Sequence, residues 1–140
     1  MDSLSLQHSM RVSVRYYEMD PLGHVNNAVY LHYAEEAAIE HSRRLGFGEA
    51  RWRELEGAWV VRRHEIDYHR PAVAGDELEV TTRVESITQV RATRRTSIVR
   101  LNDNVLVAEA VTHWVWVGLD GRPRRLPREL IAALRQTTTP

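Results

Sequence analysis

The sequence predicts an α+β fold in which an antiparallel β-sheet wraps around one long α-helix, followed by a short C-terminal helix. One stretch has the three- and four-residue periodicity of a helix, and several others have the alternation or apolar composition of strands. No internal repeat, low-complexity tract or linker divides the 140 residues. The chain is therefore predicted to form one domain over residues 1–140.

The first strand is predicted over residues 11–17, where apolar and polar side chains alternate until Pro21 and Gly23 end the pattern. The long helix is predicted over residues 28–45, with Gly46 as its terminator. The face expected to be buried is rich in alanine and consists of Tyr30, Tyr33, Ala34, Ala37, Ala38, His41 and Leu45. Such small side chains allow a helix to lie close to the surface on which it packs.

Four more strands are predicted, over residues 58–70, 76–87, 89–101 and 105–117, and a short helix over residues 127–135. The last strand is apolar on both faces, which is typical of a strand that is covered on both sides. One long helix cannot cover all of this apolar surface. A second copy of the chain is expected to cover the rest, so the sequence predicts a homo-oligomer, either a dimer or a tetramer.

The composition excludes several classes of protein. Hydrophobic residues make up 43% and charged residues 27%, as in ordinary globular proteins. The absence of cysteine excludes disulfides, thiolate catalysis and cysteine-ligated zinc. No apolar stretch approaches the ~18 residues of a membrane span, and the first residues lack a secretion signal, so a cytoplasmic protein is expected.

The charge balance does not favour a nucleic-acid partner. The chain has 19 basic and 19 acidic residues, and every basic residue is arginine. Arg91, Arg94 and Arg95 form a local cluster that could meet phosphates or an acidic protein face. The neutral total gives little support for binding of RNA or DNA.

The stretch MDPLGHVNNAVY, residues 19–30, places a carboxylate, a histidine and two asparagines at the start of the predicted helix. Most of its residues form turns, so a strand-to-helix connection is one interpretation. A reaction centre is the other, because unpaired backbone N–H groups and the helix dipole stabilise developing negative charge. The two interpretations are compatible.

A longer pattern surrounds this stretch over about twenty residues. Its positions are Tyr16, Glu18, Asp20, Gly23, His24, Val25, Asn26, Asn27, Tyr30, Tyr33 and Glu35. With the order of predicted elements, this pattern resembles the acyl-CoA thioesterases of the 4-hydroxybenzoyl-CoA thioesterase-like family, which have the hotdog fold. The resemblance implies hydrolysis of an acyl-CoA to a free acid and CoA by a homo-oligomer that needs no cofactor.

The resemblance also implies roles for individual residues. Asp20 would act on the thioester carbonyl, as a nucleophile or as a general base for water. The backbone N–H of Asn27 would stabilise the oxyanion, and Gly23 would let the substrate approach the main chain. His24 would orient Asp20 or contact the carbonyl, and Glu35 is the alternative carboxylate.

The substrate is expected to contact the later strands as well as the helix. Arginine suits the phosphates of CoA, and relatives often supply these basic residues from a neighbouring subunit. Glu18 could tune the site through hydrogen bonds. For the phosphates, Arg91 is the first candidate, and Arg62 or Arg63 are weaker ones. The candidate substrate-binding residues are Tyr30, Glu35, Val60, Val61, Arg62 and Arg91.

Three alternatives compete with an acyl-CoA thioesterase. The acyl group could be carried by acyl carrier protein, or the chain could be a non-catalytic module that binds acyl-CoA. A metal site is the third, because the chain has seven histidines. Only His113 and Glu109 share a predicted strand face, and two ligands do not make a site, so no metal is predicted.

Overall fold

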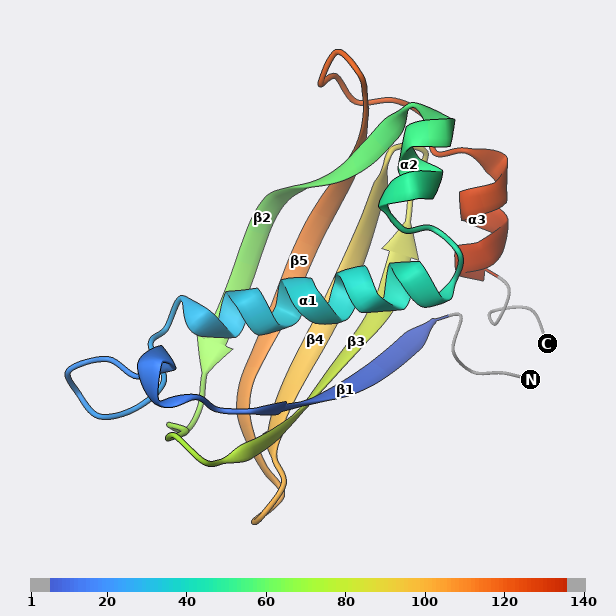
Figure 1. The fold of residues 1–140 in the computed structure, drawn as a ribbon. Coiled ribbons are helices and arrows are strands. Elements are labelled where there is room, and N and C mark those ends of the chain that lie inside the picture. Colours follow the sequence, from blue (N-terminus) through green and yellow to red (C-terminus); the bar gives the residue numbers. More distant parts are fainter. Residues whose placement is uncertain (1–5, 136–140) are drawn as a thin grey trace.

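The computed structural model describes residues 6–135 and confirms the predicted α+β fold (Figure 1). Five strands form one antiparallel sheet in the order β1-β3-β4-β5-β2, and α1 lies across one face of it. The elements are β1 (Gln7–Ser13), the 3-10 helix η2 (Tyr16–Glu18), α1 (Val29–Arg44), α2 (Glu49–Leu55), β2 (Gly57–Tyr68), β3 (Glu77–Ile87), β4 (Arg91–Arg100), β5 (Val105–Gly118) and α3 (Arg128–Arg135).

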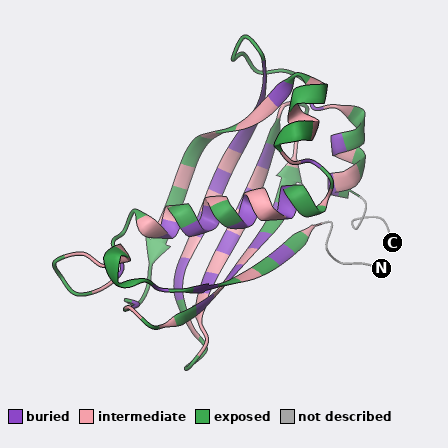
Figure 2. Cartoon of the chain, viewed as in Figure 1, coloured by how far each residue is buried: buried purple, intermediate pink, exposed green. Residues whose placement is uncertain are grey.

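The alanine-rich face of α1 is buried against the sheet, as predicted. The buried residues of this helix are Tyr30, Tyr33, Ala34, Ala37, Ala38, His41 and Ser42. Ala37 has no exposed surface and packs in one cluster with Leu78 and Val80 of β3. Figure 2 shows the buried residues along the side of α1 that faces the sheet. Leu45 lies just beyond the end of the helix and is only half-buried, so the prediction was wrong for this residue.

Helix α2 was not predicted from the sequence. It has only seven residues and none of them is fully buried. Trp52 and Leu55 pack against a second hydrophobic cluster, and Arg43 of α1 binds Glu49 at 2.8 Å. This cluster consists of Phe47, Val84, Trp116, Leu126, Leu130 and Leu134. Tertiary contacts therefore stabilise a segment too short to be a stable helix alone. Among residues 6–135, no helix combines the length and apolar character needed to cross a bilayer.

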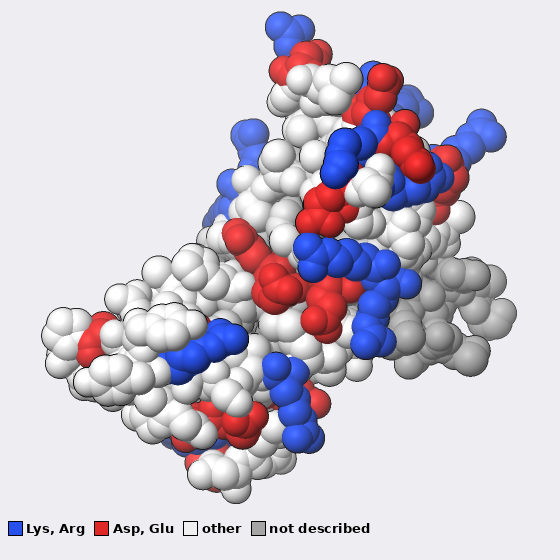
Figure 3. Space-filling view, in the orientation of Figure 1, with Lys and Arg blue, Asp and Glu red and all other residues white. Residues whose placement is uncertain are grey.

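The arginines of β4 lie on opposite faces of the sheet, which corrects the prediction of one surface cluster. Arg91 is exposed, and Arg95 binds Glu85 at 2.6 Å on the exposed side. Arg94 lies on the side of α1 and is only 7% exposed. Neighbouring residues in a strand point to opposite faces, so these three side chains cannot act together. Acidic and basic side chains are interspersed on the face over α1 and α2 (Figure 3).

Gly57, the first residue of β2, is in close contact with Trp116 of β5. A Cβ atom at this position would lie 2.6 Å from the indole ring, which is only 1% exposed and cannot easily move. We therefore predict that Gly57→Ala destabilises the fold by ~1–3 kcal/mol, as other overpacked sites do. Thermal unfolding measures this loss as a lower melting temperature.

Gly48→Ala is the matched control, because its Cβ would meet only the Arg43 side chain, at 3.2 Å. That side chain is half exposed, with 52% of its surface accessible, and can move away. An equal loss of stability in both variants would show that the contact with Trp116 is not the cause.

Candidate active site

Residues 18–26 form a tight loop that begins at the end of η2 and leads into α1. The Asn26 N–H donates to the Glu18 carbonyl at 3.0 Å, and Met19 and Val25 form an isolated β-bridge. Inside this closure the Asp20 N–H donates to the His24 carbonyl at 2.9 Å. The loop is thus fixed by its own backbone bonds, and Asp20 has a defined position within it.

The Asp20 carboxylate takes part in the turn. Its Oδ1 accepts the Leu22 N–H at 2.9 Å, and the Gly23 N–H donates to the Asp20 carbonyl at 2.9 Å. Gly23 adopts a φ of 84°, a conformation that favours glycine. Within residues 6–135 no hydrogen bond engages the other carboxylate oxygen, Oδ2. One oxygen therefore holds the loop, while the second is available for chemistry.

The start of α1 presents a free backbone donor. Asn26 accepts the Ala28 N–H with its side-chain oxygen at 2.9 Å and the Val29 N–H with its carbonyl at 2.9 Å. Asn27, the exposed residue between Asn26 and Ala28, has a backbone N–H with no hydrogen-bond acceptor in the described part of the chain. An unpaired N–H at a helix N-terminus suits a developing oxyanion.

Tyr68, at the end of β2, fixes the same residue from the other side. Its hydroxyl donates to the Asn27 carbonyl at 2.8 Å. Its ring packs edge-on against Tyr30, with the ring centroids 5.6 Å apart. Tyr68 was not among the predicted site residues. Ile66 and Tyr68 alternate with polar residues in the sequence, which indicates that both side chains lie on the strand face toward the helix.

A surface pocket opens beside this helix start. It is lined by His24, Val25, Asn27, Tyr30, Tyr68, His69, Arg70 and Pro71. Three of the predicted site residues, His24, Asn27 and Tyr30, therefore line one pocket, whereas Asp20 and Gly23 do not line it. The His24 imidazole makes no hydrogen bond with any residue between 6 and 135, so it is free to contact a bound molecule.

Glu18 is held by three hydrogen bonds below the loop. Its Oε1 accepts from the Tyr33 hydroxyl at 2.8 Å and from the Arg15 N–H at 2.9 Å, and its Oε2 accepts from the Arg15 guanidinium at 3.2 Å. Burial alone would raise the pKa of Glu18, but these donors outweigh it and lower the pKa below its ordinary value. Burial and the bond to Glu18 raise the pKa of Tyr33. Glu18 is therefore an anion that supports the loop.

Glu35 lies away from the loop. It is eight residues beyond Asn27, which places it about 12 Å further along the helix. Its Oε2 lies 3.7 Å from His64 Nε2, and the other ring nitrogen of His64 contacts the Thr112 hydroxyl at 2.8 Å. Asp20 and Glu35 therefore belong to different surroundings.

Of the residues expected to bind the acyl group and CoA, Val60, Val61 and Arg62 lie in the first half of β2, whereas Tyr68 is its last residue. Val60 and Val61 point to opposite faces of the strand, and Val60 is 43% exposed on the face away from α1. Arg62 lines an outer hollow with both valines, whereas Arg63 binds Glu65 at 3.0 Å. Six residues separate Arg62 from Tyr68, which is about 20 Å along a strand. One copy of the chain does not bring these residues to Asp20.

The described residues contain no group of three histidine, aspartate or glutamate side chains placed to hold a metal ion. Glu109 lies 3.8 Å from Arg95, and His113 contacts the Thr93 hydroxyl at 3.3 Å. Glu109 and His113, which share a strand face, therefore each contact a different residue of β4.

Comparison with known proteins places this geometry in a family. The thioesterase-like superfamily matches residues 14–134. The acyl-CoA thioester hydrolase YbgC of Escherichia coli O6:H1 is 32% identical over 126 residues, which are 89% of this chain and 93% of the relative. The chloroplastic acyl-acyl carrier protein thioesterase ATL2 of Arabidopsis thaliana is 31% identical, and the match covers 86% of this chain but only 64% of that longer protein.

A solved structure agrees with these matches. The thioesterase from Thermus thermophilus in complex with coenzyme A and Zn is 32% identical, with a TM-score of 0.80, and the alignment covers 97% of this chain and 96% of that one. The family match includes the loop, the long helix and all strands except β1. This chain therefore belongs to the thioesterase-like superfamily and has the hotdog fold of its members.

Proposed function

We propose that the protein hydrolyses an acyl-CoA thioester to a free acid and CoA. The observation that carries this proposal is that one short loop and the helix start after it hold both a free backbone N–H, at Asn27, and an Asp20 carboxylate that uses only one of its oxygens. A thioester needs both an attacking oxygen and a donor for its carbonyl. YbgC is named an acyl-CoA thioester hydrolase, which supports this substrate class.

The reaction can use these two groups along either of two routes. As a general base, Asp20 takes a proton from water while the water oxygen bonds to the carbonyl carbon. The tetrahedral oxyanion accepts the Asn27 N–H, the C–S bond breaks, and the proton passes to the CoA sulfur. As a nucleophile, the carboxylate bonds to the carbonyl carbon, the C–S bond breaks, and CoA leaves as a thiolate. Water then cleaves the mixed anhydride, which restores the Asp20 carboxylate and releases the acid, and a proton from this water ends on the CoA sulfur.

A second copy of the chain would complete the site. Strand β2 is an edge strand of 12 residues, so its outer backbone groups can pair with another strand. Antiparallel pairing of β2 with itself, in a register centred on Glu65, would place Arg62 opposite Tyr68 of the other copy, whose hydroxyl binds the Asn27 carbonyl. The homo-oligomer and its cytoplasmic location stay predictions. A monomer mass of 16.2 kDa in light scattering would contradict the homo-oligomer.

Acyl carrier protein is a second candidate for the carrier of the acyl group. The likeness to ATL2, which is named an acyl-acyl carrier protein thioesterase, favours it. The same reaction centre would serve both carriers, because they present the same thioester. CoA and acyl carrier protein differ only in the part of the carrier that lies outside the reaction centre.

We predict that Asp20→Asn lowers kcat at least a hundredfold, in the range of lost acid–base catalysis. Asparagine keeps the side-chain oxygen that accepts the Leu22 N–H, so the loop is expected to fold normally. The measurement is thiol release from a panel of acyl-CoAs, from short aliphatic to long and aromatic acyl groups. Equal turnover by both proteins would exclude Asp20 as the reactive carboxylate.

Glu35→Gln is the matched control, since it removes a carboxylate of α1 that lies outside the loop, with almost no change in side-chain size. It is expected to retain most of the activity. A loss of activity confined to Glu35→Gln would transfer the catalytic role to Glu35. If no CoA ester is turned over, acylated carrier protein is the next substrate, and inactivity on both would favour a binding module.

Glu18 is proposed to support the reaction by holding the loop in position. Its carbonyl closes the loop through the Asn26 N–H, and its carboxylate accepts the hydroxyl of Tyr33 on α1. It therefore connects the start of the loop that carries Asp20 to the helix that carries Asn27. This role concerns the position of the loop and not the chemistry itself.

Tyr33→Phe tests this connection through its pH dependence. The folded pKa of Glu18 lies below 4.5, so its stabilising bonds are fully present above that pH and are lost as the pH falls below it. We predict that the variant is less stable than wild type by ~1–3 kcal/mol at neutral pH and that this difference shrinks below pH 4.5.

Urea denaturation at neutral pH and at several pH values below 4.5 measures this difference. A difference that stays constant across the range would assign the loss to packing around the ring. In that case the ionised form of Glu18 would have no part in supporting the loop.

A further inference from the structure

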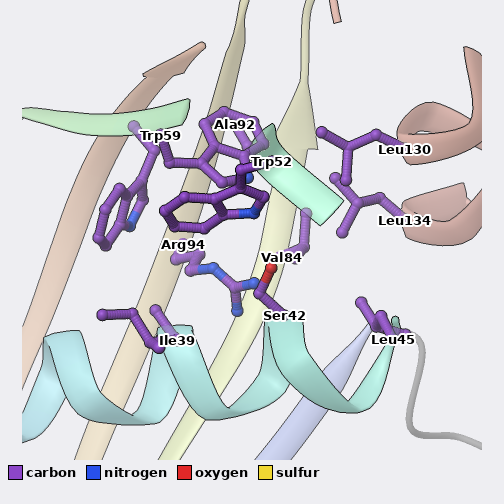
Figure 4. Close-up of a pocket in the computed structure, with 12 residues that line it drawn as sticks. Ile39, Ser42, Leu45, Trp52, Trp59, Val84, Ala92, Arg94, Leu130 and Leu134 are labelled. Carbon is purple, nitrogen blue, oxygen red and sulfur yellow. The ribbon is translucent and has the colours of Figure 1, made fainter. Parts of the chain in front are cut away.

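A second pocket lies at the other end of α1, enclosed by α1, α2, α3 and the sheet (Figure 4). Its lining is mainly apolar and includes Ile39, Leu45, Trp59, Val84, Leu130 and Leu134. Ser42, which also lines it, is fifteen residues beyond Asn27, or about 22 Å along the helix. The pocket is therefore separate from the loop of the same copy of the chain.

Two buried hydrogen-bond donors in this pocket lack an acceptor. Trp52 and Trp114 both line it, and the indole N–H of each is buried without a hydrogen-bond partner among the described residues. Trp114 is only 9% exposed. Buried donors are nearly always satisfied in folded proteins, so two of them in one pocket indicate a missing acceptor.

A buried cation lines the same pocket. The Arg94 guanidinium donates to the Thr82 hydroxyl at 3.1 Å and to His41 Nδ1 at 2.9 Å, and no carboxylate in residues 6–135 forms a salt bridge with it. In Figure 4 it lies between the indole of Trp52 and helix α1. Burial lowers the pKa of Arg94 to about 10, so it remains charged at neutral pH. A buried cation without a counterion favours an anion nearby.

The size of the pocket limits that anion. The innermost space is about 20 Å³, enough for one or two atoms of the size of water. The two oxygens of a carboxylate match it, whereas a phosphate or sulfate has four. The innermost space therefore takes the carboxylate alone. The pocket is open on one side, so the aliphatic or aromatic part of the acid would lie at its mouth, against the apolar side chains there.

We propose that this pocket binds the carboxylate of an apolar organic acid, with its oxygens at Arg94 and at the indole N–H groups of Trp52 and Trp114. The acid can come from two sources. It can be a free acid, which is the product class of the proposed reaction, or it can form the far end of an acyl group still attached to its carrier. Only this link to turnover rests on the proposed function.

The test measures binding of hexanoate and benzoate, each against the alcohol of the same skeleton, by calorimetry and tryptophan fluorescence. Both acids are expected to bind at least tenfold more tightly than the alcohols. Trp52→Phe and Trp114→Phe each remove one donor while keeping an aromatic ring, and are expected to weaken acid binding about threefold to tenfold. Arg94→Gln is expected to abolish the preference for the acid.

Trp59→Phe is the matched control, because its indole N–H is not one of the two buried unpaired donors. It is expected to retain the preference for the acid over the alcohol. The proposal is overturned if acid and alcohol bind equally, if neither binds, or if Trp59→Phe loses the preference as Trp52→Phe does. If Arg94→Gln fails to fold, the two Trp→Phe variants decide the question.

Two further comparisons separate this proposal from the proposed function and identify the source of the acid. Asp20→Asn is expected to bind the acids as wild type does, so binding can be established even if no thioester is hydrolysed. If the acyl group is the source, Trp52→Phe lowers kcat/KM for an acyl-CoA with a terminal carboxylate more than for a plain acyl-CoA of equal length. If the free acid is the source, Trp52→Phe changes both equally and weakens inhibition by the acid.

Discussion

The close packing of α1 on the sheet is the constraint on which the rest of the structure depends. Ala34, Ala37 and Ala38 present almost no side-chain bulk, so the helix backbone can approach the strands. A helix held this closely has a fixed N-terminus, and the Tyr33 and Tyr68 hydroxyls secure it further, through bonds to Glu18 and to the Asn27 carbonyl. These bonds hold the helix start that carries the Asn27 N–H and the loop that carries Asp20. In the proposed reaction, this is the preorganisation that stabilisation of an oxyanion requires.

The same helix divides the interior into two parts of different character. Its N-terminal half packs in an apolar cluster with Leu78, Val80 and Ile98, where no buried polar group is left unpaired among the described residues. Its C-terminal half faces Arg94 and the indoles of Trp52 and Trp114 instead. An apolar core there would be more stable than a buried cation with two unpaired donors, because unpaired polar groups are costly when buried. Polar groups retained at that cost are more readily explained by a ligand than by stability.

Much of the fold and of the loop could be predicted because both depend on local patterns. The spacing of alanines and tyrosines identified α1 and its buried face, and the turn-forming residues between 19 and 30 identified the loop, while the roles of Asp20, Gly23 and Asn27 came from the family resemblance. Helix α2 could not be found because its seven residues are stabilised by contacts distant in sequence. The burial of Arg94 was not predicted. A signal was available in the sequence, because Ala92, Thr96 and Ile98 share the strand face of Arg94 at two-residue spacing. The distance between Asp20 and Arg62 depends on how the strands pair, and a single sequence does not contain that information.

The central claim is that the Asn27 N–H receives the thioester oxygen beside Asp20. The most direct measurement is the change in backbone amide chemical shifts when the protein binds a hydrolysis-resistant acyl-CoA in which a methylene group replaces the thioester sulfur. This analogue keeps the carbonyl, so a new hydrogen bond must change the amide that donates it. We expect the largest downfield change of the amide proton at Asn27, with smaller changes at Gly23 and His24. An unchanged Asn27 signal, together with large changes around Glu35 and His64, would contradict the account and place the reaction further along α1.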